Sequence, residues 1–400
     1  MTKQIQEAYI VNALRTPVGK APRGMYRHTR PDDMLVHVLR GLLDGYPQLD
    51  RQQIADVIIG CAMPEAEQGM NVARIGLLLA GLPESVPGIT INRFCASGLQ
   101  AVAMAADRIR LGEAELMVAG GVESMSLIPM MGNKAAFNPR LLRDNEHVGI
   151  AYGMGITAEN VALRWKVDRQ VQDAFALESH QRAVAAIGAS EFEQEILPYE
   201  IINATPDLDK QEVMRECQRV DTDEGPRADT SLAALAKLRP AFAAHGSVTA
   251  GNSSQMSDGA AAVLLASERA LKTYDLVPMA RFLGYSVAGV DPQIMGIGPI
   301  KAIPKVLKQT GLKQDQLDWV ELNEAFAAQS VAVINELGLD TSKVNPLGGA
   351  IALGHPLGAT GAVRTATVIH GLRRHQLTYG VVSMCVGTGM GAAGVFENIV

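Results

Sequence analysis

Short apolar segments alternate along the chain with longer segments whose apolar residues recur at helical spacing. In the first third of the sequence, the short apolar runs predict buried strands at 8–12, 56–60, 88–92 and 116–119. Small and apolar residues at 96–111 recur with a helical period and predict a helix between the last two of these strands. This order of strand, helix and strand is typical of a layered α/β fold.

The C-terminal part of the chain repeats this order of elements. Strands are predicted at 279–285, 319–322, 343–345, 381–384 and 394–396. A helix rich in small residues is predicted at 359–373. The repeat concerns the order of the elements and not the identity of the residues, and it indicates two similar halves.

A segment of different character separates the two halves. It contains several Asn and Pro residues, polar turns and a long amphipathic helical pattern at 158–187, and the Gly-rich sequence at 251–254 leads back to the core. We therefore predict three regions: an N-terminal half at 1–125 that is completed by 256–277, an inserted loop domain at 126–255, and a C-terminal half at 278–400.

The composition is that of a globular protein with more than one core. Of the 400 residues, 48% are hydrophobic and 20% are charged, and a chain of this length exceeds the usual size of a single core. The formal net charge of -6 argues against a general attraction to nucleic acids or anionic membranes. The N-terminal residues lack the charged start and long apolar run of a signal peptide, and no apolar run is as long as a membrane span. We therefore expect a cytoplasmic protein.

The cysteines are widely separated and form no Cys-x-x-Cys pair; they are Cys61, Cys95, Cys217 and Cys385. This spacing is a poor basis for a disulfide framework or a zinc site. We expect free thiols in a reducing compartment.

Cys95 lies between a predicted strand and a predicted helix of small residues. At the start of a helix, unpaired backbone N–H groups and the helix dipole favour the thiolate, so this position predicts a nucleophile with a lowered pKa. A buried core cysteine is the alternative, because that is the commonest state of a free cysteine. The position alone leaves both interpretations open.

His355 lies in a Gly-rich segment at 345–361. Glycines at this density indicate a tightly held loop with close backbone approach, in which a His can act as a base or as a donor to an oxyanion. The segment lacks the Gly-Lys-Ser/Thr ending of a phosphate loop, so we exclude a nucleotide triphosphatase. A structural His with ordinary hydrogen bonds is the alternative.

Two further polar groups follow predicted strands. Cys385 directly follows the strand at 381–384 and precedes Gly387, and a thiol at a strand end beside glycines could transfer a proton. Asn323 follows the strand at 319–322 and begins the sequence Asn-Glu-Ala-Phe. For Asn323 alone, an ordinary helix cap is the alternative.

Taken together, these segments closely resemble the thiolase family: they are NRFCASG (92–98), GGVESM (120–125), NEAFA (323–327), GHP (354–356) and CVGTG (385–389). Further segments also resemble it: MGITAEN (154–160), KLRPAF (237–242), TAGN (249–252) and MGIGP (295–299). Each motif alone is weak, but their joint order covers nearly the whole chain. The resemblance implies an α/β fold that is duplicated, has five layers in the order α-β-α-β-α, and contains an inserted loop domain.

The resemblance also implies roles for the matching residues. Cys95 would be the acylated nucleophile, His355 would activate it, and Cys385 would be the acid and base for the second substrate. Asn323 would hold a water that forms one oxyanion site together with His355, and the backbone N–H groups of Cys95 and Gly387 would form the other. The implied reaction is cleavage of 3-ketoacyl-CoA by CoA into acetyl-CoA and a shortened acyl-CoA, or the reverse condensation.

The resemblance places the CoA-binding contacts mostly on the inserted domain, at Met154, Arg227, Phe242, Ser254, Met295 and Phe326. CoA and 3-ketoacyl-CoA would be substrates, with no cofactor and no metal. A homodimer or homotetramer is implied, and a hydratase/dehydrogenase subunit is a further candidate partner.

One position distinguishes the branches of the family. The short-chain biosynthetic branch tends to carry a His immediately before Met-Gly-Ile-Thr, and this chain has Gly153 there. We therefore favour a degradative 3-ketoacyl-CoA thiolase of fatty-acid β-oxidation, with a biosynthetic acetoacetyl-CoA thiolase as the alternative. A decarboxylating ketoacyl synthase would be expected to carry a His in place of Cys385. A zinc-binding or lipid-transfer protein is the alternative without catalysis.

Overall fold

A computed structural model describes residues 5–143 and 147–399. Within these residues, ten strands form one mixed sheet in the order β10-β11-β12-β9-β1-β8-β5-β3-β4, with β2 paired to β8. The strands are β1 (Ala8–Arg15), β2 (Gly19–Lys20), β3 (Ile54–Gly60), β4 (Gly88–Ile91), β5 (Leu116–Ser124), β8 (Ser257–Ala266), β9 (Ala280–Gly289), β10 (Trp319–Leu322), β11 (Tyr379–Val386) and β12 (Met390–Asn398).

The two halves of this sheet have the same topology. In the first half, β3 is parallel to β4 and β5, and β8 is antiparallel to both β5 and β1. In the second half, β10 is parallel to β11 and forms a parallel bridge at Val344, and β12 is antiparallel to both β11 and β9. Residues 8–10 of β1 and 280–282 of β9 join the halves. The predicted duplication is therefore present, although the strand expected at 343–345 is wrong, because this segment forms a single bridge.

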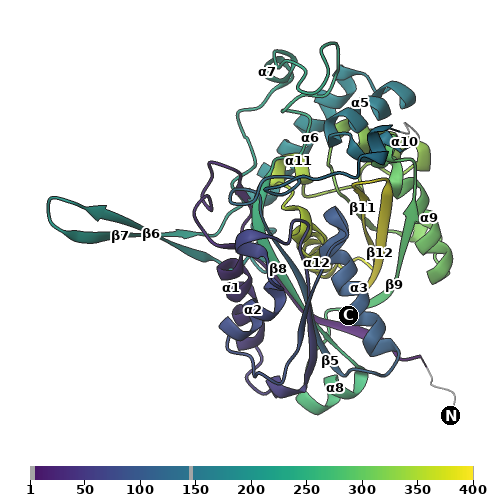
Figure 1. Ribbon diagram of the computed structural model, residues 1–400. Coiled ribbons are helices and arrows are strands. Elements are labelled where there is room, and N and C mark those ends of the chain that lie inside the picture. The colour runs from purple at the N-terminus through teal and green to yellow at the C-terminus, as the bar shows by residue number, and fades with distance from the viewer. Residues whose placement is uncertain (1–4, 144–146, 400) are drawn as a thin grey trace.

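Helices cover the sheet in three layers. Helices α1 (Pro31–Asp44) and α2 (Val72–Leu79) pack on the outer face of the first half, with α8 (Glu268–Tyr274) following β8. Helices α9 (Gly298–Thr310) and α10 (Ala327–Leu337) cover the outer face of the second half. Between the halves lie α3 (Ser97–Arg110) and α12 (Leu357–Arg374), which contact strands of both (Figure 1). The predicted five-layered α/β fold is confirmed.

The central helices contain many small residues because they are buried between the two halves over most of their length, and exposed residues occur only in their last turns. Every residue of α12 from 357 to 372 is buried. The two helices also approach closely, since a Cβ on Gly98 would lie 2.7 Å from the backbone nitrogen of Ala362. This close packing fixes the starts of α3 and α12 relative to each other, and these starts follow Cys95 and His355.

Residues 126–255 form elements outside the ten-stranded sheet: α4 (Arg140–Arg143), α5 (Met154–Trp165), α6 (Arg169–Gly188), the hairpin of β6 (Tyr199–Asp207) and β7 (Glu212–Val220), and α7 (Leu232–Ala236). The single helical pattern expected at 158–187 is wrong. Two helices occur because Lys166 adopts a left-handed conformation (φ 55°) and the Asp168 side chain accepts a hydrogen bond from the backbone N–H of Val171.

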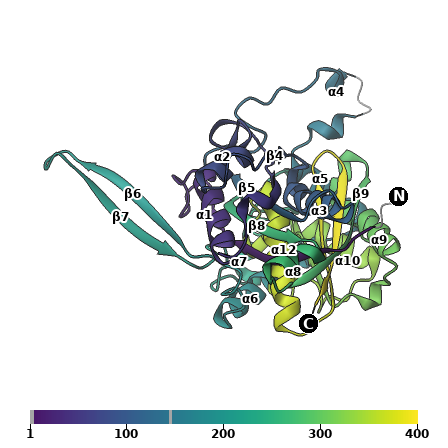
Figure 2. The same ribbon diagram turned by 90° about the horizontal axis from the view of Figure 1, so that it is seen from below.

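The hairpin projects away from the other elements (Figures 1 and 2), and was not expected from the polar turns of this region. The boundaries at 125, 255 and 277 remain predictions. Of the helices in the part of the chain that the structure describes, none is both long and apolar enough to cross a membrane.

Candidate active site

Cys95 lies in a short 3-10 turn, Phe94–Ala96, that joins β4 to α3. The turn is held by Ser97, whose hydroxyl donates to the carbonyl oxygen of Phe94 (2.7 Å) and accepts from the backbone N–H of Arg93 (2.8 Å). Phe94 itself has a positive φ of 44°. The sequence therefore places the Cys95 sulfur at the start of α3, as predicted, with 9% of the residue exposed.

The predicted lowering of the Cys95 pKa is wrong for the protein without substrate. Burial raises the pKa of the Cys95 thiol to about 11, and the negative charge of Glu123 adds to this rise. The backbone N–H groups of Gly387 and of Cys95 itself act in the opposite direction and lower the pKa. Desolvation outweighs the helix start here, so the resting residue is a neutral thiol.

Cys385 is the second sulfur at this site. It is the penultimate residue of β11 and is fully buried. Burial raises the pKa of the Cys385 thiol, and the charge of Cys95 raises it further. Because Cys95 acts on the pKa of Cys385 and the Gly387 N–H acts on the pKa of Cys95, the structure brings these three residues together from distant parts of the chain.

His355 and Asn323 form the polar side of the site. The Nε2 of His355 lies 3.3 Å from the Nδ2 of Asn323, and its Nδ1 lies 2.6 Å from the Oγ1 of Thr360. An amide NH2 can only donate, so Nε2 accepts from Asn323 and Nδ1 carries the proton that is donated to Thr360. This assignment follows from the placement of the amide nitrogen. It leaves Nε2 as the basic nitrogen of the ring.

Burial also keeps the imidazole neutral. It lowers the pKa of His355 to about 3, and the charge of Arg364 contributes to the lowering. The backbone N–H of His355 donates to the Ser257 hydroxyl (3.0 Å), which holds the backbone that carries the ring. A neutral, oriented imidazole is suited to accept a proton from a neutral thiol when that thiol reacts.

Asn323 is not a helix cap, so that alternative is wrong. Helix α10 begins at Ala327 with Phe326 at the N-cap position. The backbone N–H of Asn323 instead donates to the carbonyl oxygen of Ser383 (2.8 Å), which continues the pairing of β10 with β11. This contact directs the Asn323 side chain toward His355.

Three of the residues expected to contact CoA, Met154, Met295 and Phe326, pack in one apolar cluster with Cys385. The Phe242 ring lies edge-on to the Phe326 ring, with 6.0 Å between the ring centroids. These apolar walls surround the second thiol.

Ser254 borders the same cluster through its backbone N–H, which donates to the carbonyl oxygen of Ala325 (2.9 Å). Its neighbour Ser253 forms a β-bridge with Phe326. The segment that returns from the 126–255 region is therefore fastened to the turn after Asn323.

Arg227 lies in a cavity of about 390 Å³ whose lining also includes Lys20, His180 and Gln255. Its guanidinium is exposed and pairs with Asp229 at 3.2 Å. Gln255, which lines this cavity, also contacts His355, because its carbonyl oxygen accepts from the backbone N–H of His355 (3.2 Å). The cavity therefore lies next to the candidate site. Arg227 is thus placed with a second cation, Lys20, on the approach to the site.

Three residues that support the site were not predicted: Glu123, Thr360 and Glu324. Glu123 is 1% exposed and accepts from the backbone N–H groups of Ala62 (2.7 Å) and Gly358 (2.8 Å), so it joins the start of α12 to the turn after β3. A carboxylate inside the GGVESM motif was a visible signal for Glu123. Thr360 lies in the first turn of α12, whereas His355 precedes this helix, so no helical spacing in the sequence pointed to their contact.

The candidate site contains a thiol at the start of a helix, a second buried thiol, a neutral imidazole and two sets of hydrogen-bond donors. Backbone N–H groups at Cys95 and Gly387 are suited to an oxyanion formed during attack at Cys95. The side chains of His355 and Asn323 are suited to a second negative charge nearby. Such a site can perform acyl transfer to a cysteine together with formation or stabilisation of an enolate.

Comparison with known proteins agrees with this chemistry. Residues 8–269 match the thiolase N-terminal domain and residues 276–398 the thiolase C-terminal domain. The chain is 49% identical to a 3-ketoacyl-CoA thiolase of Bacillus subtilis, over 98% of this chain and 100% of that protein. It is 47% identical to the peroxisomal 3-ketoacyl-CoA thiolase B of Mus musculus, over 98% of this chain and 91% of that protein. The crystal structure of the dimeric peroxisomal thiolase of Saccharomyces cerevisiae has a TM-score of 0.89 at 40% identity and covers 100% of this chain and 99% of that chain.

Proposed function

This chain belongs to the thiolase family, and on that premise we propose that it reacts through an acyl-cysteine at Cys95. The protein is an acetyl-CoA C-acyltransferase that cleaves 3-ketoacyl-CoA with CoA into acetyl-CoA and a shortened acyl-CoA. Thiolytic cleavage in fatty-acid β-oxidation fits these relatives, and the biosynthetic acetoacetyl-CoA alternative is not favoured.

One observation carries the proposed roles of the residues. Two thiols, Cys95 and Cys385, lie at one site with the backbone N–H of Gly387. A neutral His355 is held by Asn323 at its unprotonated Nε2 and by Thr360 at its Nδ1. A single acyl transfer needs one nucleophile and one base. A second buried thiol is accounted for by a second proton transfer at carbon.

In the first half-reaction, the Nε2 of His355 takes the proton of Cys95, and the thiolate attacks the 3-keto carbon of the substrate. The bond between C2 and C3 then breaks, and its electron pair forms the enolate of acetyl-CoA. His355 and a water held by Asn323 stabilise the enolate oxygen. Cys385 gives its proton to the enolate carbon, which releases acetyl-CoA and leaves an acyl group on Cys95.

In the second half-reaction, Cys385 takes the proton of a free CoA thiol, and the CoA sulfur attacks the acyl group on Cys95. The backbone N–H groups of Cys95 and Gly387 stabilise the resulting oxyanion. Collapse of this intermediate breaks the bond to the Cys95 sulfur and releases the shortened acyl-CoA, and the Cys95 thiolate takes back the proton held on the Nε2 of His355. The two half-reactions predict ping-pong kinetics.

For CoA binding, we propose the region 126–255 together with the apolar cluster around Cys385. The cations Lys20 and Arg227 in the cavity suit the phosphate groups of CoA. The cluster of Met154, Met295 and Phe326 suits the pantetheine arm. CoA acts here as a substrate, so the reaction requires no resident cofactor.

The family fits a homo-oligomer, and the yeast relative is described as dimeric. We propose a homodimer or homotetramer in this protein, and a hydratase/dehydrogenase subunit as a further partner. We also propose a reducing compartment such as the cytoplasm. Support for this comes from Cys61, Cys95, Cys217 and Cys385, all of which are free thiols.

The variant Cys385→Ser tests the division of roles. We expect acetyl-CoA still to acetylate Cys95, whereas thiolysis of a 3-ketoacyl-CoA falls by roughly 10²–10³, because a serine hydroxyl is a poor acid at carbon and a poor base toward CoA. Mass spectrometry of the acetylated peptide and a thiolysis assay measure the two steps. Unchanged thiolysis in this variant would remove Cys385 from the mechanism.

A further inference from the structure

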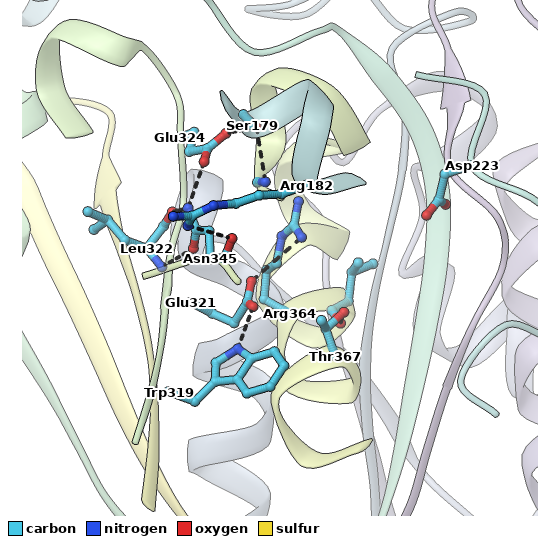
Figure 3. A network of polar contacts seen from close by, with 12 residues as sticks. Ser179, Arg182, Asp223, Trp319, Glu321, Leu322, Glu324, Asn345, Arg364 and Thr367 are labelled. Atoms are coloured by element: carbon cyan, nitrogen blue, oxygen red, sulfur yellow. Dashed lines mark hydrogen bonds and ion pairs between the residues drawn. The ribbon is translucent and has the colours of Figure 1, made fainter. Parts of the chain in front are cut away.

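Glu324 is a buried carboxylate directly behind the enolate-stabilising pair. The residue is 1% exposed and follows Asn323 in the turn between β10 and α10. Its carboxylate accepts hydrogen bonds from the Ser179 hydroxyl (2.7 Å), the Asn345 side-chain NH2 (2.8 Å) and the backbone N–H of Ile351 (3.1 Å). Figure 3 shows Ser179, Glu324 and Asn345 converging from separate elements.

The direction of these hydrogen bonds is fixed by the neighbouring backbone. The Oδ1 of Asn345 accepts from the backbone N–H of Leu322 (2.8 Å), and its NH2 donates to the carbonyl oxygen of Leu322 (2.8 Å). The amide orientation is therefore set, and the NH2 faces Glu324. An amide NH2 and a backbone N–H can only donate, so both carboxylate oxygens must act as acceptors.

The surrounding chain is shaped for this carboxylate. A side chain at Gly349 would overlap with the Glu324 carboxyl group, so a glycine is required there. The backbone N–H of Gly349 donates to the Ser179 hydroxyl (3.1 Å), which leaves the hydroxyl proton for Glu324. Burial raises the pKa of Glu324, and the hydrogen bonds from its three partners act against this rise.

Glu324 thereby joins three segments with separate tasks. It belongs to the turn that carries Asn323, it binds the segment 345–351 that leads to His355, and through Ser179 it binds α6 of the region proposed to hold CoA. Arg182, one turn further along α6, adds a second link because its guanidinium donates to the carbonyl oxygens of Val344 (2.5 Å) and Asn345 (3.3 Å).

We propose that Glu324 is a positioning residue for carbon–carbon bond cleavage, which holds Asn323 against His355 and fastens this pair to the CoA-binding region through Ser179. This inference rests on the proposed function. In the proposed mechanism, His355 and the water held by Asn323 stabilise the enolate. The backbone N–H groups of Cys95 and Gly387 stabilise the oxyanion formed during acyl transfer. Glu324 therefore acts on the enolate step more strongly than on acylation of Cys95.

The isosteric variant Glu324→Gln tests this. A glutamine offers one acceptor oxygen in place of two, so its NH2 must face either the Asn345 NH2 or the Ile351 N–H, and the turn shifts. We expect thiolysis of a 3-ketoacyl-CoA to fall by roughly 10–10², since oxyanion donors act only when accurately placed. Acetylation of Cys95 by acetyl-CoA, followed by rapid-quench mass spectrometry, should fall by less than about threefold, because the Cys95 and Gly387 N–H groups remain in place.

A double variant shows whether Glu324 acts through Asn323. In Asn323→Ala the amide is already lost, so adding Glu324→Gln should lower thiolysis by less than about threefold more. Independent losses that multiply in the double variant would overturn the proposal. Equal losses of thiolysis and acetylation in Glu324→Gln would also overturn it, because they would indicate general damage.

Two further variants keep the test valid. If Glu324→Gln does not fold, Ser179→Ala is the substitute, because it removes one hydrogen-bond donor to Glu324. It should lower the ratio of the thiolysis rate to the acetylation rate by about fivefold, which corresponds to the free energy of about one hydrogen bond. The control is Glu195→Gln, the same change at another buried carboxylate, which pairs with Arg15 (2.6 Å). It should lower stability and leave the ratio unchanged; a shifted ratio here would overturn the proposal.

Failure of the proposed function is a separate result. If Asn323→Ala does not lower thiolysis selectively, the enolate role of Asn323 is wrong and the proposed function fails. If Asn323→Ala lowers it selectively and Glu324→Gln does not, only the positioning role of Glu324 fails.

Discussion

The two halves of the sheet place side chains at matching positions of the site, but the halves use them differently. Cys61 follows β3 and Asn323 follows the equivalent strand β10. Cys95 precedes α3 and His355 precedes the equivalent helix α12. The duplicated fold thus supplies equivalent positions from both halves, and the residue type at each position decides its task.

A third pair of positions makes the contrast sharper. Glu123 is the penultimate residue of β5 and lies opposite Gly259 of β8, and Cys385 is the penultimate residue of β11 and lies opposite Gly391 of β12. Glu123 binds backbone N–H groups and supports the turns, whereas Cys385 is proposed to transfer protons. In the proposed mechanism, the first half therefore contributes the nucleophile and structural support, and the second half contributes most of the acid–base chemistry.

Burial acts in opposite directions on the two residues that precede the central helices. It raises the pKa of Cys95 to about 11 and lowers the pKa of His355 to about 3. Both groups are therefore neutral across the physiological range, and no ion pair forms before substrate binds. Removal of Cys95 deletes the proposed nucleophile, whereas removal of His355 deletes the proposed base, so the two halves can be tested separately.

The largest effect is expected when the first half loses its nucleophile. Cys95→Ala should abolish acetylation by acetyl-CoA and lower thiolysis by roughly 10⁴ or more, since no other group can form the covalent intermediate. Mass spectrometry of the protein after incubation with acetyl-CoA measures the first effect. An unchanged acetyl label in this variant would place the nucleophile elsewhere, most directly at Cys385, and would reverse the assignment of the halves.

A smaller effect is expected in the pH dependence of the two thiols. The folded pKa of Cys95, about 11, lies above the value of about 8.5 for free cysteine, so the thiolate fraction should still rise about tenfold per pH unit between pH 8 and 10. Alkylation of Cys95 by iodoacetamide, followed by peptide mass spectrometry, should show this rise, whereas free cysteine levels off near pH 9. A plateau of Cys95 below pH 8 would indicate a thiolate at rest.

The same experiment compares Cys95 with Cys385. Cys385 is fully buried, and the N–H of Gly387 that lowers the Cys95 pKa is not among the groups that act on it. We expect Cys95 to be alkylated at least about tenfold faster at pH 9, because a raised pKa and lost exposure both reduce reactivity. Equal alkylation rates would contradict the inferred electrostatic difference between the two sulfurs.

The sequence was sufficient to predict the duplicated order of elements and the positions of Cys95 and His355. These predictions succeeded because central strands and helices of small residues leave strong local patterns, and because a Gly-rich loop around a single His is conspicuous. The pKa of Cys95 could not be read in the same way, since burial at the end of a strand depends on the packing of both halves. The helix start alone suggested the opposite direction.

The remaining omissions and errors have separate physical causes. Ser179 and Glu324 are 145 positions apart, and no spacing rule joins them. The break at Lys166 was missed because a left-handed Lys leaves no sign in the hydrophobic period. The hairpin of β6 and β7 was missed because β7 is exposed along nearly its whole length and so lacks the alternation that marks a half-buried strand.

The smallest effect is expected at Cys61, the counterpart of Asn323 in the first half. Cys61 is fully buried and its sulfur lies 4.0 Å from the carboxylate of Glu123, so it packs behind the site. Cys61→Ala should lower the free energy of unfolding by about 1 kcal/mol through lost packing. Thiolysis should stay within about twofold, because no proposed step uses this thiol; denaturant unfolding and the thiolysis assay measure the two quantities. A loss of thiolysis by more than about tenfold, with Cys95 still acetylated, would approach the loss of roughly 10²–10³ that removal of one oxyanion donor causes. It would show that the position after β3 takes part in the reaction, as the position after β10 is proposed to do.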